Sequence, residues 1–92
     1  MSFQSRMQLH VLVYQIVSFR ILCGNYEDSV GVRSRLEAET RRRIRRLSEL
    51  ENKSEIEAAR SLCDMYQTKV DQLPASHNAV TRAPRPTTLL NL

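Results

Sequence analysis

The run LHVLVYQIVSFRILC, residues 9–23, constrains the fold most, because its residue types favour a strand whereas its spacing favours a helix. The apolar residues that recur at three-four spacing are Leu9, Leu12, Ile16, Phe19 and Cys23. This spacing places them on one helical seam, while strict apolar–polar alternation fails. The run also exceeds a typical strand of about five or six residues. The sequence therefore predicts a first helix over about residues 5–23.

Three polar residues, His10, Gln15 and Arg20, interrupt this run. A membrane span needs about twenty continuous apolar residues, and no small-residue cleavage site follows as in a secretory signal. We therefore expect no transmembrane segment. Because the predicted helix is apolar on most of its circumference, we expect it to be retained as a core helix. It would be wrapped by the rest of the chain and a ligand, or buried in a larger complex.

A second helix is predicted over residues 31–51, after the segment CGNYEDSVGV, in which Asp28 or Ser29 could cap it. Its apolar positions are sparse: Val32, Leu36, Ile44, Leu47 and Leu50. Oppositely charged residues lie four apart, where they can pair on a helix surface: Arg35 with Glu39, Glu37 with Arg41, and Arg45 with Glu49. The pattern indicates one narrow apolar stripe on a charged rod.

A third helix is predicted over residues 55–73, because Ser54 and Glu57 have the spacing of a capping box. The three-four pattern continues through Ile56, Ala59, Cys63, Tyr66, Val70 and Leu73. Pro74 ends it, and the short link before Ser54 favours antiparallel packing of the second and third helices. We expect an all-α, three-helix up-down-up bundle over residues 1–73. Residues 74–92 should form an extended, proline-containing tail, whose final LLNL is expected to dock on the domain or a partner.

No residue pattern predicts an enzyme or a metal site. His10 and His77 are isolated from other metal ligands, and Cys23 and Cys63 have no metal or redox spacing, so we expect buried thiols in a reducing compartment. The formal net charge of +4 comes almost entirely from arginine. Such a balance favours an acidic partner, which could be a protein, RNA or anionic lipid.

The segment RRRIRR, residues 41–46, holds five arginines in six residues. At about 100° per residue, four of them share the side away from the apolar stripe: Arg41, Arg42, Arg45 and Arg46. Arg43 is expected on the stripe itself, one heptad after Leu36 and one before Leu50. Its guanidinium should either reach out to water or face an anion. The cluster could be a solvated salt-bridged face, a surface for an acidic protein, or an RNA-binding surface.

The chain resembles the LYR-motif family of small, basic, three-helix mitochondrial proteins. The first helix carries Val13-Tyr14-Gln15 where the family has Leu-Tyr-Arg, with Arg20 one to two turns further on. The second helix is arginine-rich, and the third opens with an acid-Ile-acid turn after a polar cap, as in NKSEIEAARSL. The resemblance covers about residues 9–73. It implies binding of the mitochondrial acyl carrier protein, with no cofactor bound directly except the acyl-phosphopantetheine of the carrier.

The leading hypothesis is therefore a non-enzymatic helical adaptor, assembly factor or accessory subunit of a mitochondrial complex, in the matrix or on the matrix side of the inner membrane. The residues expected to contact the carrier are Tyr14, Arg20, Arg42, Arg43 and Arg46. The residues expected to line the acyl chain are Leu12, Ile16, Phe19, Cys63 and Tyr66. One alternative is a small RNA-associated or ribosomal protein that uses residues 41–46 with Arg82 and Arg85. Another is a homo-oligomeric coiled coil through the seam of residues 56–73.

Overall fold

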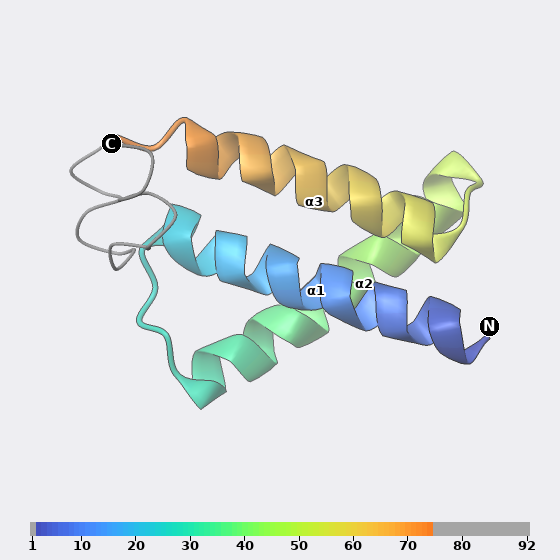
Figure 1. Ribbon diagram of the computed structural model, residues 1–92, viewed down its shortest axis with the longest axis horizontal. Coiled ribbons are helices and arrows are strands. Elements are labelled where there is room, and N and C mark those ends of the chain that lie inside the picture. The colour runs from blue at the N-terminus through green and yellow to red at the C-terminus, as the bar shows by residue number, and fades with distance from the viewer. Residues whose placement is uncertain (1, 75–92) are drawn as a thin grey trace.

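The computed structural model describes residues 2–74, which form three α-helices (Figure 1). Helix α1 spans Phe3–Gly24, α2 spans Val30–Glu51 and α3 spans Glu55–Asp71. Residues 2–74 contain no strand, so the predicted all-α class is confirmed. Of the predicted tail, the segment 75–92 lies outside the described residues, and with it His77 and the final LLNL.

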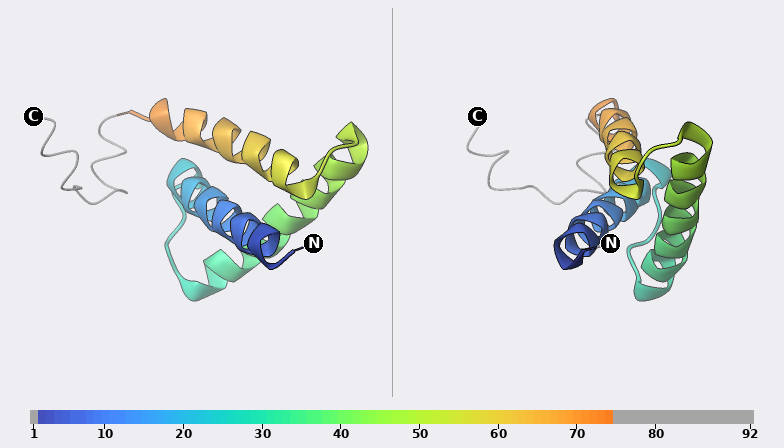
Figure 2. Two further views of the ribbon diagram at one scale, coloured as in Figure 1. Left: turned by 45° about the vertical axis from the view of Figure 1, so that its right-hand side comes forward. Right: turned by 90° about the vertical axis from the view of Figure 1, so that its right-hand side faces the viewer.

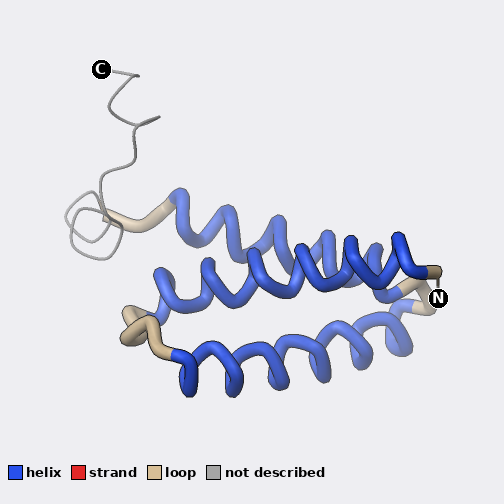
Figure 3. Tube along the Cα trace, turned by 60° about the horizontal axis from the view of Figure 1, so that its bottom comes forward, coloured by secondary structure: helices blue, strands red, loops and turns tan. Residues whose placement is uncertain are grey.

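The helices run up, down and up, as predicted. Figure 3 shows the connection between α1 and α2 at one end of the molecule and the turn between α2 and α3 at the other. Helices α2 and α3 lie close together at their shared turn and separate toward the N-terminal end of α2 (Figure 2). Helix α1 packs against both of them, and more extensively against α3 than against α2.

Each helix begins after a serine that caps it: Ser2, Ser29 and Ser54. The serine Oγ atoms accept hydrogen bonds of 3.1 to 3.2 Å from the backbone N–H three residues further on. These bonds satisfy donors that the first turn of a helix leaves without a partner. Helix α1 begins two residues before its predicted start because Ser2 caps it. At the other end, α1 and α2 stop at Asn25 and Asn52, whose φ angles are 54° and 52°, a left-handed conformation that asparagine tolerates.

The predicted capping box at the start of α3 is confirmed. Glu57 Oε1 accepts a hydrogen bond from the backbone N–H of Ser54 at 3.4 Å and one from its hydroxyl at 3.0 Å. At its other end α3 stops at Asp71, two residues before the predicted end. The backbone N–H of Gln72 closes the last turn on the carbonyl oxygens of Thr68 and Lys69.

We expect Ser54→Ala to lower the free energy of unfolding by about 0.5–2 kcal/mol, because it removes the cap and one side of the capping box. The measurement is urea-induced unfolding followed by circular dichroism. Ser34→Ala is the matched control, since Ser34 is exposed within α2 and makes no side-chain hydrogen bond among residues 2–74. Equal stability of the two variants would contradict the role given to the cap.

The core is an apolar cluster between the three helices. Its α1 residues are Leu9, Val13, Ile16, Val17 and Ile21. Leu12 and Phe19 pack against this cluster but are only partly buried. The predicted seam of α1 is therefore partly wrong, because the buried stripe follows Val13, Val17 and Ile21 rather than Leu12, Phe19 and Cys23. An apolar helix offers several seams of equal spacing, and packing against α2 and α3 selects one of them.

Only five of the 22 residues of α1 are buried, so α2 and α3 alone cover only part of its circumference. Helix α1 is long and apolar enough to cross a membrane by length and composition alone. A core helix of a bundle and an N-terminal signal sequence meet the same criterion, so this finding is weak support for a membrane span. Within residues 2–74, the α2 and α3 helices do not meet it.

Candidate partner-binding groove on the second helix

Three arginines of the segment 41–46 lie on one flank of α2. Arg42, Arg43 and Arg46 line a groove of about 330 Å³ together with Glu39 and Leu47, and we call these five residues the arginine groove. The other two arginines of the segment, Arg41 and Arg45, border a different hollow. The structure thus brings together three of the predicted contact residues.

The apolar stripe of α2 runs through Leu36, Thr40 and Ile44, which are its buried residues. Arg43, whose guanidinium is expected to reach out of the stripe to water or to face an anion, is exposed, and its guanidinium reaches Tyr66 of α3. Leu50, the other end of the predicted heptad, is also exposed. A straight helix has 3.6 residues per turn, so a seven-residue repeat drifts by about 20° per heptad. Over two heptads this drift carries Leu50 off the buried face, while Val32, Leu36, Ile44 and Leu47 stay in or against the core.

Arg43 extends the arginine groove to α3. Its Nη1 donates a hydrogen bond of 3.3 Å to Tyr66 Oη. Lys69 Nζ lies over the Tyr66 ring, 5.3 Å from its centroid, in a cation–π contact. Among residues 2–74, no carboxylate forms an ion pair with Arg42, Arg43 or Arg46. These cations are therefore available to an external anion.

The acid of the groove, Glu39, is already paired. Arg20 of α1 donates from Nη2 to Glu39 Oε1 at 3.1 Å and from Nη1 to Thr40 Oγ1 at 3.3 Å. Thr40 is 1% exposed, so this guanidinium reaches a buried hydroxyl as well as a surface carboxylate. We call this arrangement the Arg20 clamp. It joins α1 to α2 and neutralises Glu39, which leaves the groove positively charged.

The Arg20 clamp replaces an expected pair within α2. Glu39 was predicted to pair with Arg35 four residues before it, but it pairs with Arg20 instead. Of the three predicted pairs of α2, the structure contains the one between Arg41 Nε and Glu37 Oε2, at 3.2 Å. A spacing of four residues shows which side chains can meet along one helix, but not whether a charged residue of a neighbouring helix pairs with one of them instead.

We expect Arg20→Gln to lower the free energy of unfolding by about 1–2 kcal/mol, because both bonds of a partly buried guanidinium are lost. Chemical denaturation measures this change. Arg42→Gln removes the same charge from an exposed site without an ion pair and should change stability by less than about 0.5 kcal/mol. If the Arg20→Gln variant had the same free energy of unfolding as the Arg42→Gln variant, the Arg20 clamp would contribute nothing to stability.

Tyr14, the fifth predicted contact residue, lies on a different side of the molecule. It borders a hollow of about 220 Å³ between α1 and α2, with Val13 and Val17 among its lining residues. The Cζ atom of Arg33 lies 5.0 Å from the Tyr14 ring centroid. The predicted contact set is therefore split, with Tyr14 apart from the arginine groove and the Arg20 clamp. No sequence pattern relates Tyr14 to Arg33, which meet only through the packing of α1 on α2.

Arg33 is held by two side chains besides Tyr14. Its Nε and Nη2 donate to the two carboxylate oxygens of Asp28 at 2.7 and 3.0 Å, and Nη1 donates to Ser18 Oγ at 3.3 Å. The hydrogen bond from Arg33 lowers the pKa of Asp28, and the same bond raises the pKa of Arg33. A carboxyl with a lowered pKa stabilises the fold above its unfolded pKa, and this contribution is lost as the pH falls through the folded pKa.

The five residues predicted to line an acyl chain lie together. Ile16 and Cys63 are buried, and Leu12, Phe19 and Tyr66 pack against the same core. Gln15 Oε1 accepts a hydrogen bond from Cys63 Sγ at 3.5 Å. In this structure these side chains fill the space between α1 and α3. Tyr66 belongs both to this interior group and, through Arg43, to the edge of the arginine groove.

Both cysteines are free thiols, with Cys63 buried and Cys23 partly buried. Burial raises the pKa of both thiols, so they are protonated at neutral pH. No group of three or more histidine, cysteine, aspartate or glutamate side chains that could hold a metal occurs among the described residues. His10 instead lies with Nδ1 3.5 Å from Arg41 Nη2.

In the comparisons with known proteins, no family model, no curated protein and no solved structure matches this chain.

Proposed function

We propose that this chain is a non-enzymatic helical adaptor that binds an acidic acyl carrier protein through the arginine groove and links it to a larger mitochondrial assembly. The observation that carries the proposal is the grouping of Arg42, Arg43 and Arg46 in one groove without an intramolecular carboxylate partner. The resemblance to the LYR-motif family supports the identity of the carrier and the mitochondrial location.

The charge of the groove favours an anionic partner. The Arg20 clamp holds the carboxylate of Glu39, so an incoming acid would meet guanidinium groups rather than a mixed surface. Lys69 adds a further cation beside Tyr66. Complementary charge of this kind steers association and sets orientation.

The position of Tyr66 supports an acyl-bearing partner in particular. A chain delivered at the arginine groove would pass Tyr66 and reach Phe19, Ile16, Leu12 and Cys63, all of which belong to the core or pack against it. The chain would have to part α1 from α3, because these side chains now fill that space. Binding would then depend on the acyl chain as well as on charge.

An acidic protein is favoured over RNA by the surroundings of the groove. Single-stranded nucleic acid is held by cations together with aromatic rings on which bases stack. The aromatic ring at this groove, Tyr66, has Lys69 lying over it, and Leu47 lines the groove beside the arginines. RNA remains the alternative outcome of the binding test.

The test is titration with a recombinant mitochondrial acyl carrier protein that carries a long-chain acyl-phosphopantetheine. We expect the double variant Arg42→Gln, Arg46→Gln to weaken binding about tenfold or more, because two groove cations are lost. The unacylated carrier should bind more weakly than the acylated one, since the apolar contribution is absent.

The matched control is the double variant Arg45→Gln, Arg60→Gln, which removes the same charge from exposed positions outside the groove. It should bind the carrier like the wild type. Equal weakening by both double variants, or no binding of the acylated carrier to the wild type, would overturn the proposal. Tight binding of a labelled RNA oligonucleotide would favour the RNA alternative, if the logarithm of its association constant falls linearly with the logarithm of the salt concentration.

A further inference from the structure

Helix α1 exposes a row of large apolar side chains along its outer face. Phe3, Met7, Val11 and Tyr14 are 78%, 49%, 50% and 59% exposed. They are spaced four, four and three apart, so they form one continuous stripe on a helix. We call these four residues the α1 stripe. Three turns of helix, about 16 Å along the axis, separate its first and last residues.

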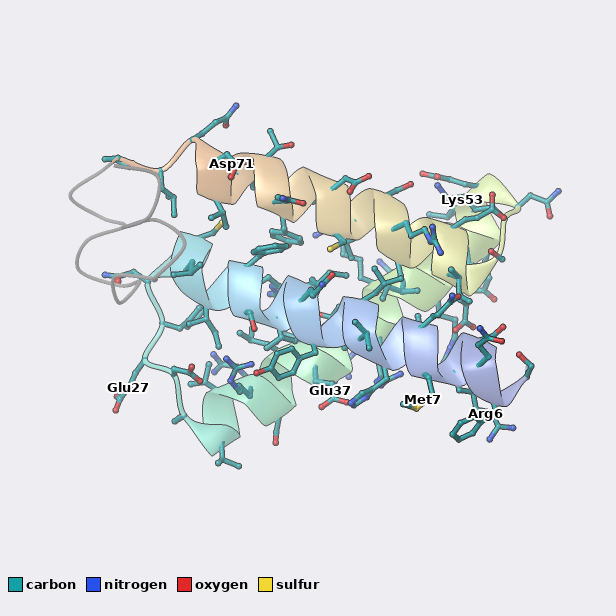
Figure 4. The ribbon with its side chains drawn as sticks, in the orientation of Figure 1. Arg6, Met7, Glu27, Glu37, Lys53 and Asp71 are labelled. Atoms are coloured by element: carbon teal, nitrogen blue, oxygen red, sulfur yellow. The ribbon has the colours of Figure 1, made fainter. Side chains whose placement is uncertain are left out.

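The α1 stripe itself contains no charged residue, and its exposed charged neighbour on α1 is Arg6. Gln4, Gln8, His10 and Gln15 are exposed polar residues of α1 near the stripe, and α1 contains no aspartate or glutamate. Of the two arginines of α1, Arg20 is turned toward α2 in the Arg20 clamp, while Arg6 is exposed beside Met7 and both project outward near the N-terminal end (Figure 4). A helix that faces water normally presents charged residues on that side, and a contiguous apolar row of this kind marks an interaction site.

The α1 stripe is a ridge between two hollows. On the α3 side, a hollow of about 390 Å³ is lined by Gln4, Met7, Gln8, Val11, Leu12 and Arg60. On the α2 side, Tyr14 borders a hollow of about 220 Å³, whose other lining residues are His10, Val13, Val17, Arg33 and Glu37. A ridge flanked by grooves is the relief into which another helix packs its side chains. The exposed amides of the glutamines can hydrogen-bond across such an interface.

The charge at the margins of this surface is positive. Arg6 and Arg60 form no ion pair among residues 2–74. On the α2 side, the carboxylate of Glu37 is taken up by Arg41. A second copy of this chain would offer Arg6 and Arg60 no free carboxylate from this surface, because α1 contains no aspartate or glutamate and Glu37 is paired with Arg41. Carboxylates beside the apolar face of a partner would instead meet Arg6 and Arg60.

We propose that the α1 stripe docks an amphipathic helix of another protein, whose apolar side is flanked by aspartate or glutamate. Arg60 lies on α3 and Arg6 in the second turn of α1, so the flanking carboxylates would lie near the N-terminal end of α1. This surface is separate from the arginine groove on α2, and it stands whether or not an acyl carrier binds there.

The test is site-specific photo-crosslinking in the native cells, with p-benzoylphenylalanine at Val11 of the full chain. We expect a crosslink to a segment of another protein that has apolar residues at three-four spacing and acidic residues beside them. The same crosslinker at Ser34, on the exposed outer face of α2, is the position control. It should not capture that segment.

Two variants sharpen the experiment. Met7→Glu should reduce the Val11 crosslink at least about tenfold, because it places a carboxylate in the apolar contact, whereas Met7→Leu should preserve it. Met7 is exposed, so both variants should fold, as checked by circular dichroism. Arg60→Glu should weaken the crosslink, and a Glu→Arg change in the captured segment should restore it.

The proposal is overturned if Val11 crosslinks to lipid, to a second copy of this chain or to a segment without acidic flanks. It is also overturned if Val11 yields no crosslinked product above the Ser34 control. The double variant Arg42→Gln, Arg46→Gln should leave the Val11 crosslink unchanged. Loss of carrier binding with the crosslink retained, or the reverse, therefore separates the two proposals.

Discussion

The rest of the structure depends on the burial of one face of α1 against both other helices. This face is distinct from the exposed α1 stripe and contains Leu9, Val13, Ile16, Val17 and Ile21. Helices α2 and α3 touch near their shared turn and then separate, so α1 supplies the apolar surface that covers both (Figure 2). Val13 and Ile16, at the middle of this buried face, are almost completely buried. Helix α1 is apolar on nearly every side, and two partners can cover only part of its circumference. The exposed remainder is what makes this helix a candidate docking surface.

The Arg20 clamp couples this packing to the charge of α2. It ties the C-terminal half of α1 to Glu39 and Thr40 and so takes up the acid that would otherwise offset the arginine groove. The same contact therefore serves stability and leaves Arg42, Arg43 and Arg46 available to a partner. A small helical domain with one cationic groove and one apolar stripe has two distinct faces, which is what the proposed adaptor role requires.

Local signals in the sequence predicted the three helices and placed their ends to within two residues, because caps such as Ser54 act within a few residues of the chain. They predicted the cluster of arginines, but not that Arg42, Arg43 and Arg46 line one groove while Arg41 and Arg45 border another hollow. The packing of the other helices decides which side of α2 is buried, and a local sequence pattern does not contain that information. The guanidinium of Arg43 leaves the apolar stripe and meets Tyr66 of α3, a partner that no sequence pattern predicted. Glu39 was expected to pair within α2 and pairs with Arg20. Tyr14 lies apart from the arginine groove, because Arg33 and the α1–α2 contact fix its position.

Native mass spectrometry of the endogenous protein, purified gently from its native cells, tests the central claim most directly. The adaptor account predicts a complex that contains one acyl carrier protein with an acylated phosphopantetheine and at least one further protein. Dissociation of the carrier at raised ionic strength should follow, because the arginine groove acts through exposed charges. A protein recovered alone, with RNA, or only with further copies of itself would contradict the account.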